Sequence, residues 1–74
     1  MGNIKKAFGS AVRKRRKKIG LSQEKLAEFA DIHRTYVSSI ELGKVAVGID
    51  VSYKIARALK TSLHKLAQDA ENRL

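Results

Sequence analysis

The chain has 74 residues, of which 43% are apolar, and 16 Lys and Arg against seven Asp and Glu give it a formal charge of +9. A chain of this length is one domain, residues 1–74, which buries roughly 60% of its unfolded surface around one small core. Cysteine is absent, which excludes disulfides, Cys-ligated zinc and thiol catalysis. The positive charge suits a nucleic acid or an anionic membrane as partner, and a solvated, solubility-promoting surface is the alternative.

Apolar residues recur every three or four positions and the chain contains no proline, a pattern that predicts an all-α domain. The first helix is expected over residues 4–19, where Gly20 ends it. The second is expected over residues 22–29, with Ser22 as N-cap and with Leu26 and Phe29 facing the core. The apolar stripe of the first helix consists of Ile4, Phe8, Ala11, Val12 and Ile19.

Three further helices follow the same spacing. His33 opens the third helix and Gly43 ends it. Residues 44–48 form a connection, and a fourth helix follows over about residues 49–59. Ser62 is the expected N-cap of the fifth helix, whose stripe is Leu63, Leu66 and Ala70.

Two hydrophobic staples support the second and third helices, since an apolar residue before each N-cap is matched by one in the first turns. Only residues 30–32 separate these helices, and so short a turn makes them cross steeply rather than lie antiparallel. The staple pairs are Leu21 with Leu26, and Ile32 with Val37.

Residues 23–42, QEKLAEFADIHRTYVSSIEL, resemble the helix-turn-helix of the Cro/CI-like (XRE family) transcriptional regulators. Ala27 stands where that motif has a small residue, Asp31 at its turn position, and Val37 and Ile40 where branched residues hold the third helix. The resemblance covers about residues 8–67, and HRTYVSSIE is most similar to the controller proteins of restriction–modification systems. It implies a compact five-helix, lambda-repressor-like DNA-binding domain with its helix-turn-helix at about residues 22–42.

Three positions depart from the family pattern. Asp31 replaces the usual Gly, and Asp accepts the left-handed turn at modest cost. His33 replaces the usual Ser or Thr and is a weaker N-cap. Many controllers continue with Arg and Asn after Gly43, whereas Lys44, Val45 and Ala46 follow here, so the base contact of those family residues is not carried over.

The third helix carries polar residues of varied length around a narrow apolar stripe. At 100° per residue, Val37, Ile40 and Glu41 face inward while the polar residues point outward or lie on the shoulders. A helix of this motif enters the major groove and reads base edges from its N-terminal part, and Arg suits a bidentate contact to guanine. The candidate base-contact residues are Arg34, Thr35, Tyr36, Ser38 and Ser39. The alternative is a polar helix surface without a ligand.

Contacts to the DNA backbone are expected around this helix. Gln23 lies in the first turn of the second helix, where amides can bind a phosphate, and the resemblance implies the same role for it. Lys25, His33 and Lys44 are weaker candidates, and His33 can equally be a cap that faces solvent.

The basic run Arg13–Lys18 is distributed all round the first helix and therefore forms no single flat patch. The resemblance implies that Arg16 pairs with the inward-facing Glu41. Arg13, Lys14 and Lys17 either add contacts to the DNA backbone or form a solvated face.

The last helices contain more apolar residues than a small monomer needs, which favours a homodimer on a pseudo-palindromic operator. Leu63 and Leu66 are assigned to the monomer core. The candidates for the dimer interface are Tyr53, Val47 and Leu74.

Other functions fit the sequence less well. His33 and His64 lie in different helices without an HExxH motif or a Gly-rich phosphate loop, so neither an enzyme nor a metal or other cofactor is expected. No apolar run is long enough for a signal peptide or a membrane span, so the cytoplasm is the expected compartment. The alternatives are a phage-type repressor or antitoxin on the same fold, or a basic membrane-surface protein. RNA polymerase is a further candidate partner, beside double-stranded DNA.

Overall fold

The computed structural model describes residues 3–74, which form five α-helices and, within that range, no strand. The all-α prediction is therefore confirmed, and each helix lies within two residues of its predicted bounds where these were given. The helices are α1 (Ile4–Lys18), α2 (Gln23–Ala30), α3 (Arg34–Glu41), α4 (Ile49–Ala58) and α5 (Leu63–Asn72).

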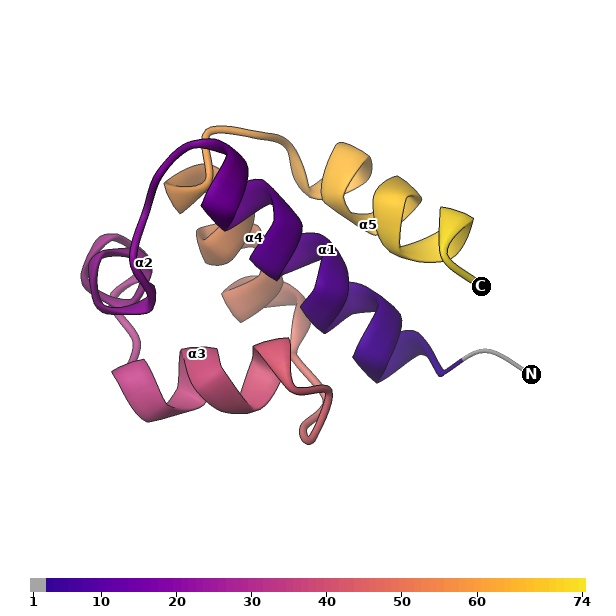
Figure 1. Cartoon of the computed structure of the whole chain (residues 1–74), viewed down its shortest axis with the longest axis horizontal. Helices are drawn as coiled ribbons and strands as arrows, with labels where there is room; N and C mark the ends of the chain where they lie inside the picture. The colour runs from indigo at the N-terminus through magenta and orange to yellow at the C-terminus, as the bar shows by residue number, and fades with distance from the viewer. Residues whose placement is uncertain (1–2) are drawn as a thin grey trace.

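Helix α1 is the central element of the fold. It packs against α3 on one side and α5 on the other, and α4 lies behind it (Figure 1). Helix α2 is seen almost down its axis while α3 lies lengthwise along the lower edge, so the two cross steeply as the short turn predicted (Figure 1). This crossing leaves one long side of α3 free of other helices.

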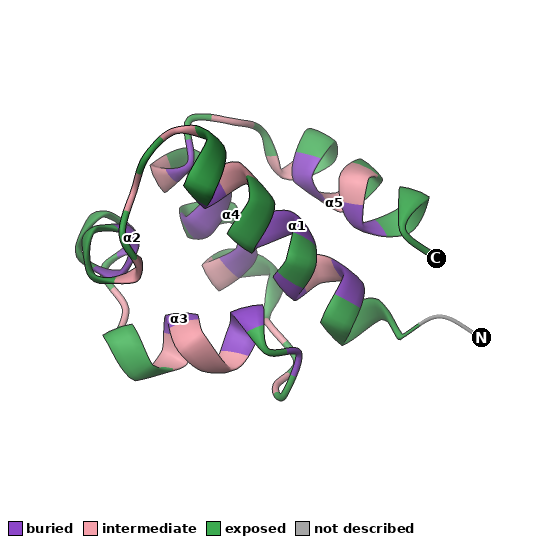
Figure 2. Ribbon diagram, viewed as in Figure 1, coloured by how far each residue is buried: buried purple, intermediate pink, exposed green. Residues whose placement is uncertain are grey.

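The buried faces of all five helices meet in one core (Figure 2). Its largest fully buried side chains come from the first four helices and from the residue that ends α4. They are Val12, Leu26, Val37, Ile40, Ile55 and Leu59. Leu66 and Ala70 close the core from α5, while Leu63 packs at its edge, which agrees with their assignment to the monomer.

Side chains cap most of the helix starts. The hydroxyls of Ser22 and Ser62 accept the backbone N–H groups of Lys25 and Lys65, each at 3.0 Å. Asn3 does the same for α1, with its Oδ1 3.0 Å from the backbone nitrogen of Lys5. These bonds satisfy donors that the first helical turn leaves unpaired.

The turn between α2 and α3 has the backbone conformation that the motif requires. Asp31 has φ 55° and ψ 48°, in the left-handed region, and its N–H donates to the carbonyl groups of α2. Lys60 adopts the same region after α4, with φ 59°, at a position that the sequence did not identify. His33 makes no side-chain cap, as its residue type suggested.

Two residues that were expected in the core lie at the surface. Phe29 is 58% exposed because Leu26, Ala27 and Ala30 define the buried side of α2 and Phe29 falls to one flank of it. Ile4 is 54% exposed because it is the first residue of α1 and extends past the core. The remaining members of the α1 stripe are buried or pack against the core.

Candidate nucleic-acid interface

Helix α3 has a buried inner side and a polar outer side. Val37 and Ile40 are each 1% exposed and anchor the inner side against the core. Arg34 and Thr35 are exposed at the N-terminal end, whereas Tyr36, Ser38 and Ser39 are half-buried along the flanks. The predicted base-contact residues are therefore brought together on one short helix. Their side chains lie at its surface and none is sealed in the core.

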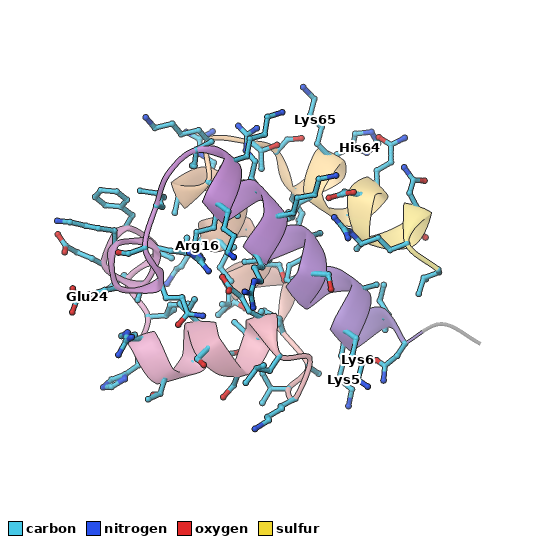
Figure 3. All side chains as sticks on the ribbon, in the orientation of Figure 1. Lys5, Lys6, Arg16, Glu24, His64 and Lys65 are labelled. Atoms are coloured by element: carbon cyan, nitrogen blue, oxygen red, sulfur yellow. The ribbon has the colours of Figure 1, made fainter. Side chains whose placement is uncertain are left out.

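Arg16 and Glu41 form a bidentate ion pair between α1 and α3. The Nε atom of Arg16 donates to Glu41 Oε2 at 2.7 Å, and Nη2 donates to Oε1 at 3.0 Å. The Arg16 Nη1 atom also donates to the carbonyl of Leu21 at 2.8 Å. Figure 3 shows Arg16 between α1 and α3. One guanidinium thus links α1, the segment before α2 and the end of α3.

The electrostatics of this pair follow from its burial. The Glu41 side chain is 1% exposed and the Arg16 side chain 11%. The hydrogen bond to Glu41 raises the pKa of Arg16 above its ordinary value, although burial acts in the opposite direction. Arg16 therefore faces Glu41 as a cation at neutral pH. A charged partner is what a buried carboxylate requires.

Gln23 contributes to the same network. Its Nε2 atom donates to Glu41 Oε1 at 3.1 Å, a contact that the sequence did not predict. The amide still has a second N–H that can donate to a phosphate at the start of α2. Gln23 is half-buried, so its side chain is not sealed in the core. Gln23, the predicted contact to the DNA backbone, is therefore linked to the Arg16–Glu41 ion pair through the Glu41 carboxylate.

Gly9 allows α1 to lie directly against the last turn of α3. A Cβ atom at this position would collide with the backbone carbonyl oxygen of Ile40 and lie 2.9 Å from that of Glu41. Only glycine avoids contact of this kind with a backbone. Sequence reasoning missed this role, because one glycine within a helix gives no signal of what passes beside it.

The remaining backbone candidates lie at the surface around α3. The His33 ring Nδ1 lies 3.0 Å from the Thr35 hydroxyl, so these two side chains are coupled at the helix start. The Lys25 ammonium lies 3.6 Å from the Glu28 carboxylate in an exposed ion pair. Such a pair is weak, so the Lys25 ammonium can also bind another anion. Lys44 is exposed just after α3.

Of the three candidate dimer residues, Val47 lines an apolar groove, whereas Tyr53 and Leu74 lie outside it. Tyr53 and Leu74 are 53% and 56% exposed, whereas Val47 is half-buried against the core. A groove of about 760 Å³ lies between the start of α1, the residue 45–47 segment and α5. Val47 lines it together with Ile49, which is 77% exposed and was not singled out from the sequence.

The steep α2–α3 crossing, the left-handed turn and the anchored α3 define a helix-turn-helix domain of the class that binds DNA. A helix-turn-helix family model matches residues 12–66. None of the helices in residues 3–74 has the length and apolar character needed to cross a membrane.

Comparison with known proteins identifies a smaller group within this class. The chain is 44% identical over 72 residues to control protein C.MunI from a Mycoplasma species, covering 96% of this chain and 97% of that protein. It is 50% identical over 58 residues to control protein C.BamHI from Bacillus amyloliquefaciens, covering 77% and 72%. The crystal structure of the restriction-modification controller protein C.AhdI from Aeromonas hydrophila superposes with a TM-score of 0.81 at 36% identity, covering 82% and 92%.

The chain belongs to the helix-turn-helix family and, within it, to the restriction–modification control proteins. The family resemblance inferred from residues 23–42 is thereby confirmed, as is the functional class of a DNA-binding transcriptional regulator. The family is regulatory rather than enzymatic.

Proposed function

We propose that this protein controls a restriction–modification system by binding a pseudo-palindromic operator as a homodimer, with α3 in the major groove. The observation that supports this proposal is the polar outer side of α3. The opposite side of the helix is held in the core by Val37, Ile40 and Glu41. A helix so fixed presents its outer side chains in one orientation. Loss of base contacts then cannot be relieved by rotation of the helix.

The base-reading roles follow from position along α3. Arg34 is exposed and is the first residue of the helix, so its guanidinium can extend beyond the helix end to the O6 and N7 atoms of a guanine. Thr35 and Tyr36 contact a thymine methyl, a base edge or a phosphate. Ser38 and Ser39 are short, which lets the middle of the helix lie deep in the groove.

Backbone contacts set the register of α3 on the duplex. Gln23 donates its second amide N–H to a phosphate while the first holds Glu41. His33, Lys25 and Lys44 add cationic or hydrogen-bonding contacts on either side. These residues carry affinity and salt dependence rather than sequence preference.

Dimerisation places two copies of α3 about one turn of DNA apart, roughly 34 Å, which is why the operator is expected to be pseudo-palindromic. Tyr53, Val47 and Leu74 supply apolar area for the interface, and Ile49 extends it. The cytoplasm, where operator DNA and RNA polymerase are found, is the expected compartment. Contact with RNA polymerase from the operator-bound dimer is the proposed route to activation.

Selection of bound duplexes from a random pool tests this function. We expect a consensus of two related half-sites whose centres lie one helical turn apart, and sedimentation should show a dimer on the selected duplex. Recovery of duplexes without a consensus, or equal binding to anionic liposomes and DNA, would refute sequence-specific regulation.

A further inference from the structure

A second cationic surface lies on the edge of the molecule opposite α3. The far basic cluster consists of Lys14, Lys18, Lys60 and Lys65, all exposed, together with the half-buried Arg15. Figure 1 places the end of α1 and the α4–α5 link along the upper edge, while α3 lies along the lower edge. In Figure 3, Lys65 extends away from the molecule at that upper edge.

The geometry of α1 separates this cluster from the reading side. Arg15 and Arg16 are consecutive, so their side chains leave the helix about 100° apart. Arg16 turns to Glu41 of α3, whereas Arg15 donates from Nε and Nη2 to the carbonyls of Leu59 and Lys60, each at 2.9 Å. Arg15 therefore fixes the end of α1 to the α4–α5 link.

Three of the four lysines lie close to that attachment in the chain. Lys18 lies three residues after Arg15 and four after Lys14, so it neighbours both on the helix surface. Lys60 lies in the link itself, where its carbonyl accepts the Arg15 bond. Because Arg15 binds uncharged carbonyls, its own positive charge remains uncompensated there.

Acidic residues are absent from the chain segments that carry this cluster. The first acidic residue in the chain is Glu24, and none occurs between Asp50 and Asp69. The ion pairs found within residues 3–74 are those of Arg16, Lys25 and Arg73, all outside the four lysines. Lys14 and Lys18, four residues apart on α1, repel each other, and a bound polyanion would relieve that repulsion.

From this cluster we infer that the protein binds the phosphate backbone of a second DNA duplex, independently of sequence, while α3 occupies its operator. A straight duplex against the outer side of α3 would lie at the lower edge of the molecule, whereas the end of α1 and the α4–α5 link, which carry Lys18 and Lys60, lie along the upper edge (Figure 1). The inference rests on the proposed function in one respect, namely that α3 binds the first duplex.

The chemistry favours DNA over other polyanionic partners. Exposed lysines make contacts to phosphates that release counterions and need no shape match. Protein interfaces are poor in Lys and rich in aromatic residues at their centres, and an amphipathic helix that lies in a membrane surface buries an apolar face, which this cluster does not offer. The four exposed positions of the cluster are all Lys, with no apolar residue among them.

The test uses the full chain on an immobilised selected operator and measures capture of a fluorescent random-sequence duplex. Protein is added only until the immobilised operator is saturated, and unbound protein is washed away, so that every retained α3 is occupied and no free operator competes for the cluster. Lys18→Glu with Lys60→Glu alters the cluster, and Lys5→Glu with Lys54→Glu is the matched control at exposed lysines elsewhere. Each double reversal removes four units of charge, so both variants carry +5 instead of +9.

We expect the wild type to capture the second duplex and the cluster variant to lose about tenfold in that affinity. Its logarithmic salt slope should fall by about two, one for each lost phosphate contact. The control variant should keep its affinity for the second duplex to within about threefold. Both variants should keep their affinity for the operator at a salt concentration that screens long-range electrostatic attraction.

Three results would overturn the inference: no capture by the operator-bound wild type, equal loss in both variants, or equally tight capture of polyglutamate. The last result would assign the cluster to an acidic protein. If selection yields no operator, the proposed function fails separately. The cluster is then tested on random-sequence duplex alone, where the Lys18→Glu/Lys60→Glu variant must bind more weakly than both its control and Arg34→Ala.

Discussion

Replacing Arg16 by alanine tests the central ion pair of the fold. The substitution leaves the Glu41 carboxylate, 1% exposed, with Gln23 Nε2 as its remaining side-chain donor. It also removes the bond to the Leu21 carbonyl. Breaking one partner of a buried pair costs about 3–5 kcal/mol, which is a large part of the total stability of a small domain.

The loss is measured by thermal and urea unfolding followed by circular dichroism. At about 4–8 °C per kcal/mol for a domain of this size, the midpoint should fall by at least about 12 °C. Arg13→Ala is the matched control, because Arg13 is exposed in the same helix and its loss should change stability by less than about 0.5 kcal/mol. A midpoint for Arg16→Ala within about 3 °C of the wild type would refute the reasoning.

A double variant separates the cost of leaving Glu41 buried without its partner from the net contribution of the ion pair to stability. Arg16→Met combined with Glu41→Leu removes both charges, so it should recover much of the stability lost in Arg16→Ala. The pH dependence has a definite sign, because the pKa of Arg16 is raised in the folded protein. Its stabilisation is fully present below the ordinary Arg pKa and is lost only above it. The difference between wild type and Arg16→Ala should therefore not shrink between about pH 7 and 10.

Three other substitutions have distinct expected outcomes. Gly9→Ala forces α1 away from the last turn of α3 and should lower the free energy of unfolding by about 1–3 kcal/mol in urea, whereas Ser10→Ala beside it should be neutral. Arg34→Ala should cost about 1–3 kcal/mol in operator affinity and relax the selected consensus at one base position, with no change in melting temperature. Gln23→Ala should weaken binding to all duplexes alike in titrations. Because it also removes a bond to Glu41, it should lower the free energy of unfolding by about 0.5–1.5 kcal/mol.

The positions of the helices were predictable because local signals agree with the tertiary fold. Ser22 and Ser62 cap the helices that they were expected to cap, and Asp31 adopts the left-handed turn. Each of these signals depends on a few neighbouring residues. Phe29 was misplaced because a helix buries an arc rather than its largest side chains, and two alanines determine that arc in α2.

Contacts between helices were harder to predict from the sequence. The requirement for Gly9 comes from the backbone of α3, about thirty residues away, and nothing in the local sequence of α1 indicates it. The bond between Gln23 and Glu41 likewise depends on how α2 and α3 cross. Arg16 was identified only because family resemblance supplied its partner. The pattern of charges in RKRRKK does not distinguish it from Arg15.

That distinction shows how one basic run acquires separate roles. Rotation by about 100° per residue directs Arg16 to a buried carboxylate and Arg15 to two carbonyl groups, while Lys14 and Lys18 remain in solvent. The net charge of +9 is therefore not a single DNA-binding feature. Part of it stabilises α3 from inside. Another part lies on the edge opposite α3, where we expect a single duplex on α3 to leave it unneutralised, so affinity for one operator should show a salt slope well below that expected from the total charge.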